Sequence, residues 1–133
     1  MFNTYRQIQT TFSQINYHFA FCPRYRKKIF LQENVEKRFE FLTNEICREL
    51  DIDVVTLECN QDYTYMVLNA PPTLSPAEIM AKIKGKTSRI LREEFSHLNH
   101  LPSLWTRSYF VSTSESVSSE MIKRYVELQK TRG

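Results

Sequence analysis

Cysteine and long apolar runs are scarce in this sequence. The three cysteines, Cys22, Cys47 and Cys59, are an odd number without close spacing, so neither a disulfide framework nor a zinc ribbon is expected. No apolar run reaches the roughly 18 residues that a membrane-spanning helix needs. The first residues also lack the charged and then apolar layout of a secretory signal. We therefore expect a reduced, cytoplasmic protein that has no membrane partner.

A strong net charge is missing as well. The formal charge of +3 and the sequence pI near 8.8 are mild, so the placement of the charges has to decide whether nucleic acid is a partner. The hydrophobic share of 41% and the charged share of 25% are typical of a globular protein. At 133 residues we expect a single domain over 1–133 that buries about two-thirds of the surface of its unfolded chain.

Alternating apolar residues indicate the first strand. Residues 1–13 are polar and predict an N-terminal arm, whereas apolar and polar side chains alternate from Gln14 to Cys22. Pro23 ends this strand, and a basic turn follows, made of Arg24, Tyr25, Arg26, Lys27 and Lys28. Four cations around one tyrosine would suit a phosphate backbone with a base stacked on the ring, and a solvated basic turn is the alternative.

The next segments predict a helix and a β-hairpin. Asn34 is expected to cap the helix, which runs to about Leu50. The strand pattern then occurs twice with a short turn between, and the expected strand, turn and strand are 54–59, 60–62 and 63–68. Because side chains alternate across a sheet, Tyr63 and Tyr65 share one face and lie roughly 7 Å apart along the strand.

The second helix is expected from Ser75 to about Phe95. Ser75 supplies a hydroxyl cap, proline follows, and Glu78 completes a capping box. A stripe of cations at helical spacing, Lys82, Lys86 and Arg89, suits phosphates, and a solvated surface is the alternative. Gly85, one of only two glycines, lies in the middle of this helix, where it would let another backbone approach closely.

A short strand at about 109–113 and a serine-rich connector lead to a last helix over about 118–130, within a C-terminal segment 116–133. On that helix Tyr125 and Gln129 share a face with apolar residues. One interpretation is a packed aromatic at the end of an apolar stripe. The other is chemical, because a phenol can attack phosphorus when a metal polarises the phosphate, and Gln129 offers an amide oxygen toward the same place.

Three histidines complete the set of candidate residues. His18 lies on the first strand, where a histidine hydrogen-bonded on the sheet face is expected. His97 and His100 lie in a loop and receive no role.

Five segments, in this order, resemble the single-tyrosine HUH transposases of small insertion sequences, the TnpA type of IS200-like transposases. They are Tyr17–Arg26, Asn60–Pro72, Ile83–Arg89, Leu104–Phe110 and Ile122–Gln129, and the likeness covers about residues 14–130. The last of them has a lone tyrosine four residues before a glutamine, as in the terminal helix of the family.

The resemblance implies an α+β fold of the ferredoxin-like or RRM-like kind, with an antiparallel sheet, helices packed on it and the tyrosine on the C-terminal helix. It also implies a homodimer that binds hairpin or single-stranded DNA at the ends of an insertion sequence. In the family the tyrosine attacks a phosphodiester, leaving a 5′-phosphotyrosine link and a free 3′-hydroxyl. By position, Tyr125 would be the nucleophile and Gln129 one of three ligands of Mg²⁺ or Mn²⁺.

Tyr63 and Tyr65 stand where the family has its two metal-binding histidines. A phenol must lose its proton to bind a metal strongly and neutral imidazole need not, so we expect a divalent ion to bind poorly. Asp62 could supply a substitute carboxylate, and so could Glu58 if its strand faces that way. Three functions stay open: a DNA-binding protein with impaired nicking, an active transposase with an altered ligand set, and a non-catalytic dimeric interaction protein.

Overall fold

The computed structural model describes residues 5–8 and 10–129, and these form a small hairpin, a four-stranded sheet and three α-helices. The strands are β1 Arg6–Ile8, β2 Thr11–Ser13, β3 Ile15–Phe21, β4 Asp53–Cys59, β5 Thr64–Ala70 and β6 Phe110–Ser112. The helices are α1 Glu33–Glu49, α2 Pro76–Glu94 and α3 Ser119–Leu128, with 3-10 turns η2 Arg24–Arg26, η3 Ile29–Leu31 and η4 Ser96–Leu98. Lys130, at the expected end of the last helix, lies outside the described residues.

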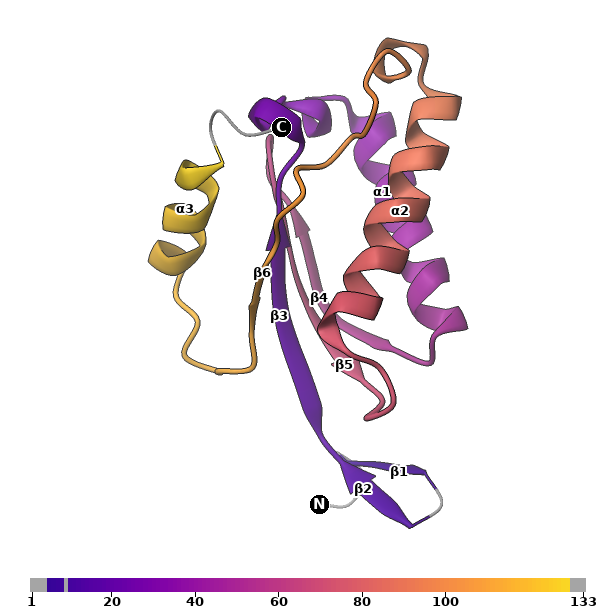
Figure 1. The fold of residues 1–133 in the computed structure, drawn as a ribbon, viewed down its shortest axis with the longest axis vertical. Helices are drawn as coiled ribbons and strands as arrows, with labels where there is room; N and C mark the ends of the chain where they lie inside the picture. Colours follow the sequence, from indigo (N-terminus) through magenta and orange to yellow (C-terminus); the bar gives the residue numbers. More distant parts are fainter. Residues whose placement is uncertain (1–4, 9, 130–133) are drawn as a thin grey trace.

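The four-stranded sheet is antiparallel, with the strand order β4-β5-β3-β6. The chain order from β3 to β6 is strand, helix, strand, strand, helix, strand, so the ferredoxin-like α+β fold implied by the resemblance is confirmed. Figure 1 shows α1 and α2 together on one face of the sheet and α3 on the opposite face. The last helix is therefore separated from the other two by the sheet.

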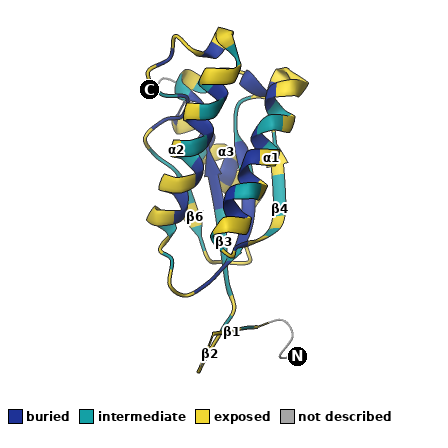
Figure 2. Ribbon diagram, turned by 90° about the vertical axis from the view of Figure 1, so that its right-hand side faces the viewer, coloured by how far each residue is buried: buried dark blue, intermediate teal, exposed yellow. Residues whose placement is uncertain are grey.

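The larger core lies between the sheet and helices α1 and α2. On β5 the side chains of Thr64, Met66 and Leu68 are completely buried, which confirms the alternation expected for this strand. Trp105 packs edge-on against Phe21, with ring centroids 4.9 Å apart, and its indole nitrogen donates to the Thr87 hydroxyl. Figure 2 shows buried and exposed residues alternating along α1 and α2, so that each helix has one buried side and one exposed side. This packing fixes the strands that carry the candidate site on their other face.

The two long helices begin in different ways. At the start of α2 the Ser75 hydroxyl accepts from the Glu78 N–H at 3.1 Å, and the Glu78 carboxylate accepts from the Ser75 N–H at 2.9 Å, as predicted. The prediction that Asn34 caps α1 is wrong. That helix begins at Glu33, after Gln32, which makes no side-chain cap bond, and its first turn is instead stabilised by acidic residues near the exposed N–H groups.

Residues 6–8 and 11–13 form strands in place of the predicted arm. The strands β1 and β2 pair with each other, and Arg6 ties the hairpin to the sheet. Its guanidinium donates to the Asn69 side-chain oxygen and to the Asn69 carbonyl oxygen, both at 2.7 Å. No helix in the described part of the chain is long and apolar enough to cross a membrane.

Candidate functional site

Helix α3 rests on the open face of the sheet over a small apolar cluster. Ala20 and Cys22 from the sheet meet Ile122 and Val126 from the helix, and all four are buried. The residues packed around this cluster are Tyr63, Tyr65, Phe110, Val117 and Tyr125. The strand register explains why α3 packs here, because Ala20 pairs with Tyr65 on one side and with Phe110 on the other. A small side chain between two aromatic ones leaves a trough that receives the apolar stripe of α3.

Tyr125 is joined to Gln129 through one hydroxyl group. The Ser108 Oγ lies 3.0 Å from the Tyr125 hydroxyl and 2.8 Å from Gln129 Oε1. Because an amide oxygen can only accept, Ser108 donates its single proton to Gln129, and the Tyr125 phenol donates to Ser108. Gln129 is only 3% exposed, whereas Tyr125 is half-buried. Their spacing of four residues does aim both at one place, as predicted, and that place is a serine that the sequence did not single out.

Lys84 of α2 fixes the backbone that carries Ser108. Its Nζ donates to the carbonyl oxygens of Thr106 at 2.8 Å and of Ser108 at 2.9 Å, and it lies 5.7 Å from the centroid of the Phe21 ring. Burial lowers the pKa of Lys84 from 10.5 to about 8. The sequence did contain a signal, because Lys84 lies three residues before Thr87 and therefore on the buried side of α2.

Tyr63 and Tyr65 border the cluster from the β5 side. The Tyr65 hydroxyl lies 2.7 Å from His18 Nδ1, so His18 is hydrogen-bonded on the sheet face as expected. Burial raises the pKa of both phenols, and nearby carboxylates add to the effect, namely Asp62 and Glu58 for Tyr63 and Glu58 for Tyr65. Both phenols therefore stay protonated at neutral pH, a state in which they are weak metal ligands.

A half-open hollow of about 170 Å³ lies beside these two tyrosines. Glu58 and Asn60 line it from the β4 side, and the first residues of α3 close it above. In the sheet Glu58 pairs directly with Tyr65. The hollow is therefore walled by neutral phenols, one carboxylate and one amide.

Two of the predicted metal ligands, Asp62 and Gln129, already have other hydrogen-bond partners. Asp62, the expected substitute, accepts at the same Oδ2 atom from Arg26 Nε at 2.9 Å and from Arg26 Nη2 at 2.8 Å. Gln129 Oε1 is committed to Ser108. Within residues 5–8 and 10–129 no three His, Cys, Asp or Glu side chains gather as a metal-binding group. With the two phenols protonated, this donor set does not fit Mg²⁺ or Mn²⁺.

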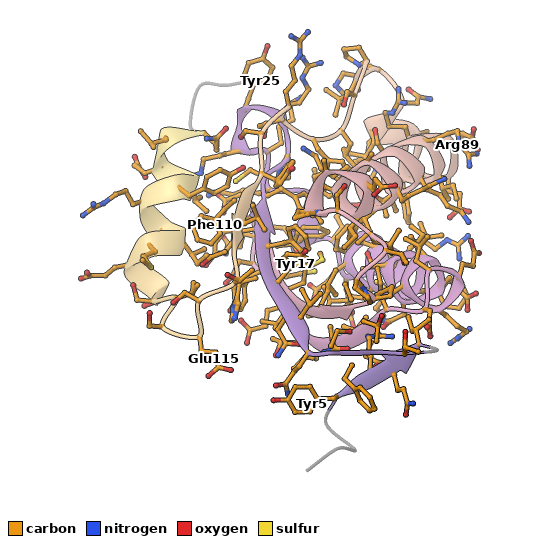
Figure 3. All side chains as sticks on the ribbon, turned by 60° about the horizontal axis from the view of Figure 1, so that its bottom comes forward. Tyr5, Tyr17, Tyr25, Arg89, Phe110 and Glu115 are labelled. Carbon is orange, nitrogen blue, oxygen red and sulfur yellow. The ribbon has the colours of Figure 1, made fainter. Side chains whose placement is uncertain are left out.

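The cations predicted to bind DNA do not form one surface. They are Arg24, Arg26, Lys27, Lys28, Lys82, Lys86 and Arg89. Arg26 is held by Asp62 and also by Glu127 of α3 at 3.1 Å. The stripe from Lys82 to Arg89 belongs to α2, across the sheet from α3, and Figure 3 shows Arg89 on that far side. At Gly85 a Cβ atom would meet nothing within 4 Å, so no described residue makes the expected close approach.

Comparison with known families and curated proteins gave a consistent result. The family described as "Transposase IS200 like" matches residues 11–129. The transposase for insertion sequence element IS200 of Salmonella typhimurium is 31% identical over 100 residues, which are 73% of this chain and 65% of that protein. The match thus spans less than two thirds of the length of that relative. The ISDra2 transposase TnpA of Deinococcus radiodurans is 24% identical over 119 residues, or 87% of this chain and 84% of the relative.

Two solved structures share the fold. A protein of Deinococcus radiodurans R1, assigned as a transposase, superimposes with a TM-score of 0.85 and 25% identity, over 93% of this chain and 97% of the other. A REP-associated tyrosine transposase bound to a REP hairpin superimposes with a TM-score of 0.57 and 10% identity, over 92% of this chain and 68% of the other.

Proposed function

Because this chain belongs to the IS200-like transposase family, we propose that it recognises hairpin and single-stranded DNA ends of an insertion sequence but nicks them poorly. A protein of the same fold is described as bound to a REP hairpin, which supports a DNA hairpin as the partner. The proposal rests on a difference between the two parts of the site, the residues of the last helix and those of the sheet. Tyr125 and Gln129 are held together on α3, whereas the residues at the two histidine places, Tyr63 and Tyr65, are protonated phenols.

Tyr125 is the proposed nucleophile. In the family reaction its phenol oxygen forms a bond to phosphorus while the bond from phosphorus to the 3′-oxygen breaks, which leaves a 5′-phosphotyrosine and a free 3′-hydroxyl. In this step the phenol loses its proton to solvent and the departing 3′-oxygen takes one up from solvent, while the hydrogen bond of the phenol points to Ser108 Oγ, which orients it. Gln129 holds the serine's own proton away, so a lone pair of Ser108 faces the phenol. We assign Ser108 and Gln129 here as positioning residues.

The impairment follows from the donor set. A divalent ion that polarises the scissile phosphate contributes several kcal/mol to such a reaction, and its loss slows the reaction by orders of magnitude. Tyr63 and Tyr65 cannot replace two imidazoles, and Arg26 already occupies Asp62. DNA binding does not depend on that ion in the same way, since it rests on cations and exposed rings. We therefore expect binding without efficient nicking.

A nicking assay tests this function. The parent and Tyr125→Phe are incubated with a labelled single-stranded oligonucleotide that contains a hairpin, in the presence of Mn²⁺, and covalent protein–DNA adduct is measured on denaturing gels. We expect little adduct from either protein and salt-dependent binding by both. Abundant adduct from the parent alone would show an active transposase with another ligand set. If the protein does not bind DNA, or binds it with an affinity that does not depend on salt, the non-catalytic interaction protein would be favoured.

A homodimer is part of the proposal. β6 is an edge strand of the sheet, and its Val111 is exposed, so a second copy of the chain could add its own strand there. Light scattering during size-exclusion chromatography measures the mass of the particle. A Val111→Lys variant should shift it toward the monomer, and an unchanged dimer would place the interface elsewhere.

A further inference from the structure

A second hollow, of about 190 Å³, lies away from α3 between two turns that are distant in sequence. The basic turn after β3 supplies Lys27 and Lys28, and the η4 turn with the residues after it supplies His97 and His100. Figure 1 shows both turns at the same end of the sheet, opposite the β1–β2 hairpin. Ile29 and Leu98, both buried, form part of the floor.

This hollow concentrates basic groups that have no acidic counterpart. No carboxylate lines it, and no ion pair is formed by Lys27, Lys28, His97 or His100 with any residue in the described ranges. The neighbouring Arg26, in contrast, is neutralised by Asp62 and Glu127. Lysine donates three N–H groups, and imidazole donates at least one in either protonation state, so the site suits a phosphate group.

The backbone beside the hollow is held in an uncommon conformation that exposes an aromatic ring. Tyr25 and Arg26 both have positive φ angles, of 58° and 49°, which are rare for residues other than glycine. The ion pairs of Arg26 stabilise this strained turn. As a result Tyr25 is 57% exposed, two residues before Lys27, and Figure 3 shows it projecting from this end of the molecule.

We propose that this hollow, together with the Tyr25 ring, binds the single-stranded DNA that flanks the hairpin. A phosphodiester lies among Lys27, Lys28, His97 and His100, and a neighbouring unpaired base stacks on Tyr25. Single-stranded DNA is favoured over a duplex stem because an exposed ring can stack only on a base that is not already paired and stacked. This assignment rests on the proposed DNA-binding function, and it gives a role to His97 and His100, for which none was expected from the sequence.

The test compares two fluorescent probes, a DNA hairpin alone and the same hairpin with a tail of thymidines, by anisotropy at several salt concentrations. We expect the parent to bind the tailed probe more tightly. Lys27→Gln with Lys28→Gln should remove that advantage. It should also make the slope of log affinity against log salt concentration shallower by about 0.7 for the tailed probe, since one phosphate neutralised on a single strand contributes about that much. His97→Ala with His100→Ala should weaken binding of the tailed probe by about tenfold or more through lost hydrogen bonds to a charged group.

Two substitutions of Tyr25 and a matched control sharpen the test. Tyr25→Asn removes the ring but tolerates the left-handed backbone, and it should weaken the tailed probe by about 5- to 150-fold, as expected for one stacked base. Tyr25→Phe should bind like the parent. Lys37→Gln with Arg48→Gln removes the same charge from exposed positions of α1 and serves as the matched control. Thermal unfolding confirms that each variant is folded.

The outcomes separate this site from the function as a whole. If the parent binds the hairpin but the tail adds nothing, or if the hollow variants behave like the α1 control, the inference is wrong and the proposed function stands. If the variants weaken both probes equally, the hollow binds the duplex stem and the single-strand assignment is overturned. If the parent binds neither probe, the proposed function and the inference fall together.

Discussion

Replacing Ser108 with alanine removes one oxygen atom on which two residues of α3 depend. The Tyr125 phenol donates to that oxygen at 3.0 Å, and Gln129 Oε1 receives its proton at 2.8 Å. Lys84 holds the Ser108 carbonyl, which the change leaves intact. Because Gln129 is 3% exposed, its amide oxygen loses a partner in a place that water reaches poorly. A buried polar group left without a partner costs about 1–3 kcal/mol of the free energy of unfolding.

Urea unfolding measures this cost. With a denaturant slope of about 1.5 kcal/mol per molar, the midpoint for Ser108→Ala should fall by about 0.7–2 M. Gln129→Met, made on its own and together with Ser108→Ala, completes a double-mutant cycle. Replacing both partners by apolar groups leaves no unsatisfied atom, so the double variant should be more stable than the sum of the single changes predicts, by about 1 kcal/mol.

Two results would refute the reasoning. If Ser108→Ala changes the free energy of unfolding by less than about 0.3 kcal/mol, the serine does not hold α3. If the two changes are simply additive, the serine and the glutamine do not depend on each other. Tyr125→Phe should cost less than Ser108→Ala, because the serine keeps its bond to Gln129 when the phenol hydroxyl is absent.

Three further outcomes are expected. Burial lowers the pKa of Lys84 from 10.5 to about 8, so the folded state binds this proton less tightly than the unfolded state. The free energy of unfolding of the parent, relative to that of Lys84→Met, should therefore rise by about 1–3 kcal/mol as pH increases from about 8 to 10.5. Urea unfolding at each pH measures this difference. In Tyr63→His with Tyr65→His, Mn²⁺ should raise the melting temperature, by the equivalent of about 2.7 kcal/mol at a Mn²⁺ concentration about a hundred times Kd. It should have no effect on the parent. If Mn²⁺ stabilises the parent and this effect disappears in Gln129→Ala, the metal argument is wrong. Ser75→Ala should cost about 1 kcal/mol through loss of the α2 cap, and an unchanged unfolding curve would show that this cap contributes nothing.

The elements of the fold could be predicted wherever the signal lies in neighbouring residues. Alternation from residue 14 to 22 and the aromatic and β-branched residues from 63 to 68 predicted the two central strands, which the structure has as Ile15–Phe21 and Thr64–Ala70. The hydroxyl, proline and glutamate from Ser75 predicted the start of α2. Asn34 shows the limit of this reasoning. It is a good capping residue, yet α1 begins at Glu33, and acidic side chains in the first turn take the place of a side-chain cap.

The candidate site was predictable in its parts but not in its connections. The spacing of Tyr125 and Gln129 placed both on one side of the last helix, and the pattern of residues 63–68 placed Tyr63 and Tyr65 on one face of the sheet. The sequence could not show that Arg26 occupies Asp62, because those residues are 36 positions apart and only strand packing brings them together. The same holds for the facing of His18 and Tyr65, which depends on the β3–β5 register.

By itself, the sequence determined the family and the order of the strands and helices along the chain, because these depend on residue type and local spacing. The tertiary structure decided which polar groups are free and which are already bound. Lys84 and Ser108 support Tyr125 from other elements, two carboxylates neutralise Arg26, and His97 lines the same hollow as the basic turn at the end of the sheet. Hydrogen bonds and ion pairs act over a few ångströms, so they are fixed only when packing brings distant segments of the chain together.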